Sequence, residues 1–141
     1  MVLYQDIAKA VTMVVKEAFP DVPIYGNEVR EGYKTPSFFI GIMPVSSINH
    51  TKSIKEEHLL ITVSYFSNTT ESLKNYRVMQ DLKVAFGQVL GVDNRRFTIQ
   101  ETNTEKVGED GDIYQFTFDI NYYELVCDES DGELVKEIIY R

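Results

Sequence analysis

Apolar side chains recur at helical spacing in two stretches of the chain. In the first stretch they are Leu3, Ile7, Val11, Val14 and Ala18, and in the second they are Leu73, Tyr76, Met79, Leu82, Phe86 and Leu90. Spacing by three and four residues places these side chains on one face of a helix. The pattern therefore predicts two amphipathic helices, over Leu3–Ala18 and Thr70–Leu90.

The ends of both helices also carry sequence signals. Proline inside a helix loses a hydrogen bond and clashes with the preceding turn, so Pro20 should end the first helix near Phe19. Thr69 or Thr70 is a suitable N-cap for the second helix. Gly91 follows its last apolar residues and is expected at its C-terminal cap.

Four other stretches have the pattern of β-strands. Glu56–Phe66, Arg95–Asn103 and Ile113–Val126 alternate between apolar and polar positions, which is typical of strands with one buried face. The most apolar face of all comprises Tyr114, Phe116, Phe118, Ile120 and Tyr122. Ser37–Met43 is continuously apolar and bounded by prolines, so we expect a strand buried on most of both faces. Gly41 in this strand could mark a bulge or a close backbone approach.

Two polar stretches separate these elements. Ser46–Lys55 has no period and reads as a mobile loop or as the tip of a long hairpin. Thr104–Asp112 is acidic, contains two glycines, and is expected to be a loop between paired strands. Helices with one apolar face each need a sheet to cover. The predicted fold is α+β, an antiparallel sheet of about four strands with two helices packed on one face, within a single domain over residues 1–127.

Composition narrows the class of protein. The 141 residues fit one domain. The contents of hydrophobic residues (43%) and charged residues (26%) are ordinary for a globular chain. A formal net charge of −8 argues against tight nucleic-acid binding, which depends on Lys and Arg. The single Cys127 cannot form an internal disulfide. No apolar run reaches the roughly 18–20 residues of a membrane span, and the start of the chain lacks the basic region of a signal peptide. We therefore expect a cytosolic protein at synthesis.

Residues 128–141 form a separate C-terminal segment. An acidic linker is followed by four aliphatic side chains at helical spacing: Leu134, Val135, Ile138 and Ile139. We expect these apolar side chains to be covered by a surface, either on their own domain or on a neighbouring subunit. These four residues are therefore candidates for a subunit interface.

Catalytic and cofactor motifs are not found. There is no P-loop or dinucleotide glycine motif and no nucleophile elbow. The acidic sequence VGEDGD lacks the alternating ligands of a calcium loop. His58 would need metal-ligand partners that the chain, with one other His and one Cys, does not offer. We expect neither an enzyme nor a bound metal or cofactor.

The stretch FPDVPIYGNEVREGYKTPSFFIGIMPV, from Phe19 to Val45, carries the most specific pattern. Together with the preceding helix it resembles the phage tail terminator family of phages and prophages of Gram-positive bacteria. Weaker similarity continues through LLITVSYFSN to YQFTFDINYYEL and covers roughly Leu3–Val126. The segment after Cys127 departs from the family pattern.

This resemblance implies a structural protein of the virion tail, assembled in the host bacterial cytoplasm. Family members form rings, commonly of six subunits, which cap the tail tube, meet the head completion protein and let DNA pass through the bore. The polar loops would supply subunit contacts or bore lining, with His50, Lys52, Lys55, Glu109, Asp110 and Asp112 as candidates. The alternative is a small cytosolic interaction or ligand-binding module that never forms a ring.

Overall fold

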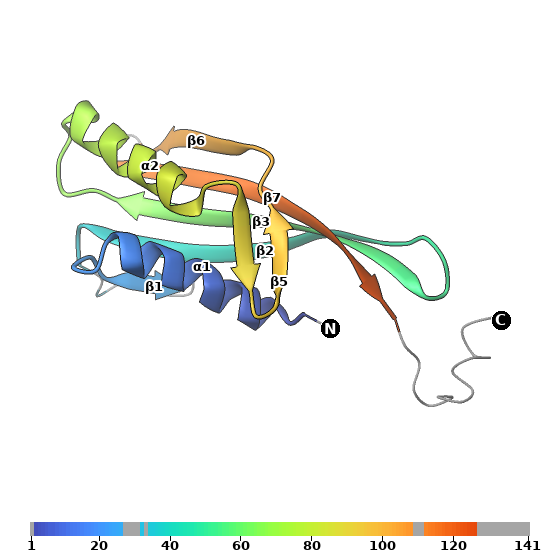
Figure 1. The fold of residues 1–141 in the computed structure, drawn as a ribbon. Coiled ribbons are helices and arrows are strands. Elements are labelled where there is room, and N and C mark those ends of the chain that lie inside the picture. The colour runs from blue at the N-terminus through green and yellow to red at the C-terminus, as the bar shows by residue number, and fades with distance from the viewer. Residues whose placement is uncertain (1, 27–31, 33, 109–111, 127–141) are drawn as a thin grey trace.

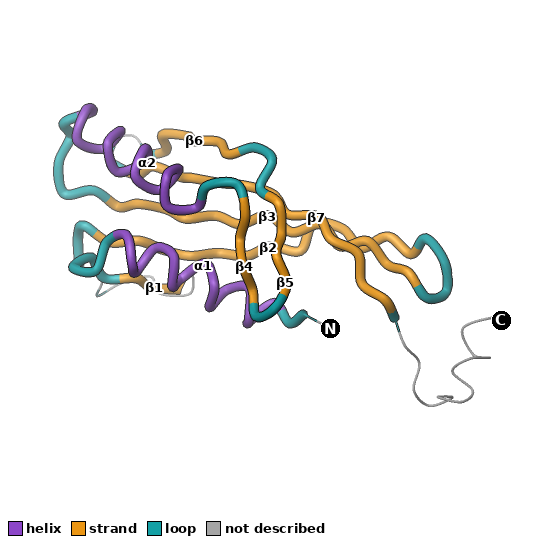
Figure 2. Tube along the Cα trace, viewed as in Figure 1, coloured by secondary structure: helices purple, strands orange, loops and turns teal. Residues whose placement is uncertain are grey.

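The computed structural model describes residues 2–26, 32, 34–108 and 112–126, which form two helices and seven strands (Figures 1 and 2). In chain order the elements are α1 (Tyr4–Ala18), β1 (Ile24–Gly26), β2 (Ser37–Asn49), β3 (Ile54–Phe66), α2 (Ser72–Phe86), β4 (Val89–Val92), β5 (Arg95–Thr98), β6 (Thr102–Val107) and β7 (Ile113–Leu125). The predicted α+β class with two helices is confirmed.

The strands form one large sheet and one small one. The large sheet has the order β1-β2-β3-β7-β6, in which β1 pairs in parallel with β2 and the other neighbours are antiparallel. The small sheet is the β4–β5 hairpin, which lies with both helices on one face of the large sheet (Figure 1). The sheet therefore has more strands than the four expected. The predicted strand Arg95–Asn103 is in fact divided between β5, which pairs with β4, and the start of β6, which pairs with β7.

One hydrophobic core fills the space between the helices and the sheet. The odd positions of β3 from Leu59 to Tyr65 and the even positions of β7 from Tyr114 to Tyr122 are buried, as the alternation predicted. Helix α1 contributes Ile7, Val11 and Val15, each with no exposed surface. The sequence pattern predicted Val14 on the buried face of this helix, but Val15 is the residue buried there. The outer residues of the predicted stripe, Leu3 and Ala18, are exposed because they lie at the helix ends.

Helix α2 ends earlier than its apolar pattern predicted. Gly87 is the C-cap, at φ +62°, and its N–H donates to the Lys83 carbonyl. The chain then turns into β4, so Leu90 is buried as a strand residue, and Gly91 lies inside that strand. The prediction of a helix to Leu90 capped by Gly91 was wrong, because Val89 and Leu90 fit the apolar period of a helix and of a strand equally well.

The start of α2 also differs from the prediction. Glu71 is the N-cap and makes no side-chain capping bond, so neither threonine has that role. A buried polar contact holds this end of the helix instead. The Ser67 hydroxyl lies 2.6 Å from Asn75 Oδ1, and Asn75 Nδ2 donates to the Thr69 carbonyl at 3.1 Å. Asn75 is 1% exposed, so these bonds satisfy an amide that would otherwise be costly to bury.

Strand β2 continues through Pro44 to Asn49, although we expected Pro44 to end it. Pairing with β3 resumes after an irregularity between Pro44 and Ser46, so the bulge lies there and not at Gly41. Proline is tolerated here because β1 pairs only with Phe38–Ile40, which leaves this part of β2 at the sheet edge. The polar stretch Ser46–Lys55 is thus mostly strand and forms the tip of a long hairpin, one of the two predicted alternatives.

Candidate functional site

A three-stranded arm projects from the domain beyond both helices (Figures 1 and 2). We define the arm as residues 44–60, which are the β2–β3 hairpin, and residues 119–125 of β7, which pair with β3. Some of its side chains are buried at the end near the domain, such as Leu59 and Ile120, whereas others are exposed. Several of its large apolar side chains are exposed, and we call this set the arm patch: Val45, Ile48, Ile54, Tyr123 and Leu125. Clustered exposed apolar groups mark interaction surfaces.

Two of the predicted loop residues lie at the tip of this arm. His50 follows β2, and its Nε2 lies 2.8 Å from Glu56 Oε1 while its ring contacts Tyr123 at 5.8 Å between centroids. Lys52 lies in the turn that connects β2 to β3. Lys55 lies on β3, next to Glu56, the residue that His50 contacts. Because neighbouring strand residues point to opposite sides, Lys55 and Glu56 lie on opposite faces of the arm.

The other predicted residues lie elsewhere. Asp112 precedes β7 at the opposite end of the sheet, where its carbonyl accepts a hydrogen bond from the Ser67 N–H. The structure therefore does not bring the two predicted loops together. Thr104–Val107, expected in the second loop, belong to β6, whose pairing with β7 gives polar residues a strand conformation. Six predicted residues lie outside the described part of the chain: Glu109, Asp110, Leu134, Val135, Ile138 and Ile139.

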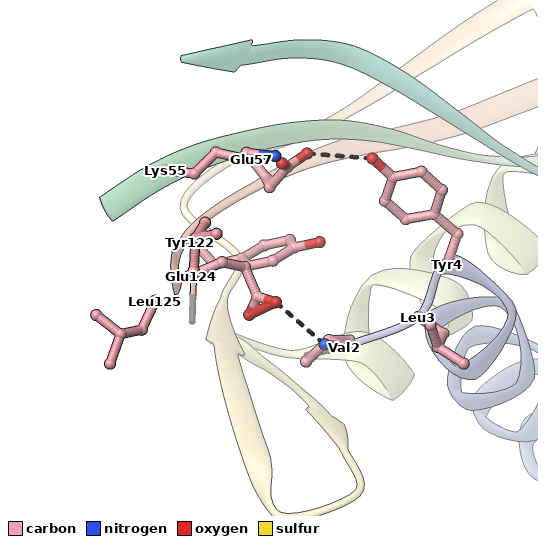
Figure 3. Close-up of a pocket in the computed structure, with 9 residues that line it drawn as sticks. Val2, Leu3, Tyr4, Lys55, Glu57, Tyr122, Glu124 and Leu125 are labelled. Atoms are coloured by element: carbon pink, nitrogen blue, oxygen red, sulfur yellow. Dashed lines mark hydrogen bonds between the residues drawn. The ribbon is translucent and has the colours of Figure 1, made fainter. Parts of the chain in front are cut away.

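A groove of about 420 Å³ lies between the start of α1 and the arm (Figure 3). Its lining comes from the N-terminal residues, β3 and the end of β7: Val2, Leu3, Tyr4, Lys55, Glu57, Tyr122, Glu124, Leu125 and Val126. Of these only Lys55 was among the predicted candidates. The signal for Glu57 was present in the sequence, because this acid falls on the apolar face of an alternating strand.

Hydroxyl groups hold the Glu57 carboxylate in this groove. Tyr4 donates to Oε1 at 3.1 Å (Figure 3). Ser47 donates to Oε2 at 2.9 Å, although Glu57 is only 8% exposed. Among the described residues Glu57 takes part in none of the ion pairs. The groove therefore contains a nearly buried negative charge that is stabilised by neutral donors.

A second acid in the groove is paired. Glu124 lies 2.6 Å from Arg95 Nη1, and its Oε1 accepts a hydrogen bond from the Val2 N–H at 3.2 Å. The Arg95 guanidinium also lies over the Tyr122 ring, 5.3 Å from its centroid. Burial, followed by the negative charge of Glu57, raises the pKa of the Tyr122 phenol to about 12. Tyr122 therefore stays neutral at physiological pH.

The described residues contain no group of three or more His, Cys, Asp and Glu side chains that could hold a metal ion. His58 Nε2 is buried and lies 3.5 Å from Asp119 Oδ2, in a geometry that does not form a hydrogen bond. No helix in the described ranges is both long enough and apolar enough to cross a membrane. The fold and these surfaces define a small α+β domain with a projecting sheet arm.

Comparison with known proteins identifies the family. A family model described as phage tail terminator protein matches residues 6–132. The chain belongs to this family, and it is a structural protein of the phage tail. The predicted resemblance is thereby confirmed.

Comparison with solved structures agrees with the fold. One structure, whose title describes no function, has a TM-score of 0.51 at 12% identity, with 88% of this chain and 96% of that chain covered. Another, titled as the virion of a native gene transfer agent particle, has a TM-score of 0.51 at 11% identity, with 84% and 94% covered. A search of curated proteins gives no significant match.

Proposed function

We propose that this protein caps the tail tube at its head-proximal end as a closed ring, with six subunits as the expected number. The family match over residues 6–132 carries this proposal, because it includes all but the first few described residues. In this function the protein stops polymerisation of the tail tube protein and presents a surface to the head completion protein. Assembly takes place in the host cytoplasm, from a phage or prophage genome.

The shape of the domain supports a ring. Contacts in a ring are heterologous, so each subunit needs two different surfaces that meet across one interface. The arm projects from one end of the sheet and presents exposed apolar residues such as Ile48 and Tyr123, whose exposed fractions are 48% and 60%. We assign the arm patch to the contact with the next subunit, with His50 and Lys52 beside it.

The charge of the chain suits a conduit for DNA. A net charge of −8 repels the phosphate backbone at long range, so DNA would pass the bore without binding tightly to its wall. Asp112, together with Glu109 and Asp110, is our candidate for acidic groups that line the bore.

Light scattering of the full chain, with and without tail tube protein, tests the proposal. We expect a closed ring either alone or on tube ends, and negative-stain images of the same samples should show it. A protein that stays monomeric and leaves tube length unchanged at every concentration and salt level would overturn the proposal. That result would instead favour a small interaction or ligand-binding module.

A further inference from the structure

The rim of the groove between α1 and the arm is unusually apolar for an exposed surface. Leu3 and Tyr4 on one side are 44% and 43% exposed, and Leu125 and Val126 on the other are 75% and 38% exposed. Single exposed apolar residues are common in proteins, but a cluster around a concave surface indicates a bound partner. The groove therefore has the character of a docking site for an aliphatic segment.

The buried carboxylate specifies a second property of the occupant. Glu57 lies in the groove, is 8% exposed, and within the described part of the chain accepts hydrogen bonds from the hydroxyls of Tyr4 and Ser47. An ionised carboxylate removed from water is costly unless a cation compensates it. An occupant that brings one basic group among aliphatic side chains would match both the rim and Glu57.

The chain itself contains such a segment immediately beyond the groove. Val126 is the last described residue and lines the groove, and the sequence continues through the linker 127–133. Lys136 and Glu137 then lie between two aliphatic pairs, Leu134-Val135 and Ile138-Ile139, so Lys136 is the basic group within the aliphatic stretch. At ~3.3–3.6 Å per extended residue, the linker spans up to roughly 25 Å, which is enough to turn back to the groove.

We infer that the segment Leu134–Arg141 docks in the groove of its own subunit, with Lys136 facing Glu57. The sequence alone left its own domain and a neighbouring subunit equally open. The position of Val126 favours its own domain, because a short tether gives the segment a high effective concentration at the adjacent groove. A segment from another molecule would also lose translational freedom on binding. This inference does not depend on the proposed capping function.

Disulfide trapping in the full chain tests the inference. In a Cys127→Ser background, Leu3→Cys is combined with Ile138→Cys, and the protein is oxidised as a mixture of unlabelled and isotope-labelled chains. Peptide mass spectrometry then distinguishes links within one chain from links between chains. The matched control combines Ile138→Cys with Lys74→Cys, an exposed position on α2 whose side chain is 70% exposed.

We expect the Leu3→Cys pair to link within one chain several-fold more than the control pair. Lys136→Glu should reduce this link several-fold, whereas Lys136→Arg should preserve it. Equal linking of both pairs would overturn the inference, and so would a product that links mainly between chains. Urea unfolding of each variant identifies any that fail to fold, and the Lys136 variants keep the test valid because they leave the described domain unchanged.

Discussion

Phe116 lies at the centre of the core and has no exposed surface. Its ring packs against Phe86 at 5.7 Å and Phe118 at 6.1 Å between centroids. Phe116→Ala leaves a cavity that these neighbours cannot fill, so we expect the free energy of unfolding to fall by ~3–5 kcal/mol. Urea denaturation measures this change. The matched control is Asn121→Ala on the exposed face of β7, which should change it by only about 0.5 kcal/mol.

Tyr122 should make the stability of the protein sensitive to alkaline pH. Its pKa is raised from 10.0 to about 12, mainly by burial, so the folded state holds the phenolic proton more tightly than the unfolded chain. Below pH 10 this contribution is fully present. Between pH 10 and about 12 the unfolded chain binds fewer protons, and the free energy of unfolding falls as the pH rises.

Tyr122→Phe removes this titration, so its free energy of unfolding should fall less steeply across the same pH window. Some slope should remain, because burial also raises the pKa of Tyr4 and Tyr65. Urea denaturation at a series of pH values provides the measurement. Tyr123→Phe, at a residue 60% exposed, is the control and should keep the slope of the wild type. Equal slopes for wild type and Tyr122→Phe would contradict the prediction.

At the scale of elements, Gly87 decides where helix α2 ends. Its φ of +62° with ψ of −132° is a conformation that side chains with a Cβ rarely adopt. We expect Gly87→Ala to lower the free energy of unfolding by about 1–3 kcal/mol. Gly91→Ala is a matched control, because Gly91 has no positive φ and open space where a Cβ would lie. Urea denaturation of both variants measures these changes. A larger loss of the free energy of unfolding in Gly91→Ala than in Gly87→Ala would contradict this account of the helix end.

At the scale of the whole molecule, the arm carries the proposed subunit contact. Ile48→Asp combined with Tyr123→Asp places two charges on the arm patch, so ring formation with tail tube protein should be lost. Both side chains are exposed, and the free energy of unfolding should therefore change by only about 0.5 kcal/mol per site.

A control for this prediction is Leu73→Asp, which changes a side chain that is 81% exposed on α2, far from the arm. Light scattering and negative-stain images compare the variants. Rings of normal size from the arm variant would show that the contact lies elsewhere on the domain. Loss of rings in the Leu73→Asp variant alone would point to the helix face.

Much of the fold was predictable from local pattern. Helix α1, its end at Phe19 and both faces of β7 follow from residue spacing and from the conformational limits of proline. The errors occurred where one pattern fits two structures. Val89 and Leu90 continue a helical period, yet the positive φ of Gly87 redirects them into a strand. Of the groove, only Lys55 was predicted, since its lining residues are distant in sequence.

The sequence by itself determined the class of fold, the membership of the family and the core face of each long strand, because periodicity and turn residues act over a few positions. Only the tertiary structure decided that polar stretches such as Ser46–Asn49 and Thr104–Val107 are strands, since their hydrogen bonds go to partners far along the chain. It also decided that Glu57 faces a groove opposite Tyr4. Contacts between distant residues depend on packing, which no local pattern specifies.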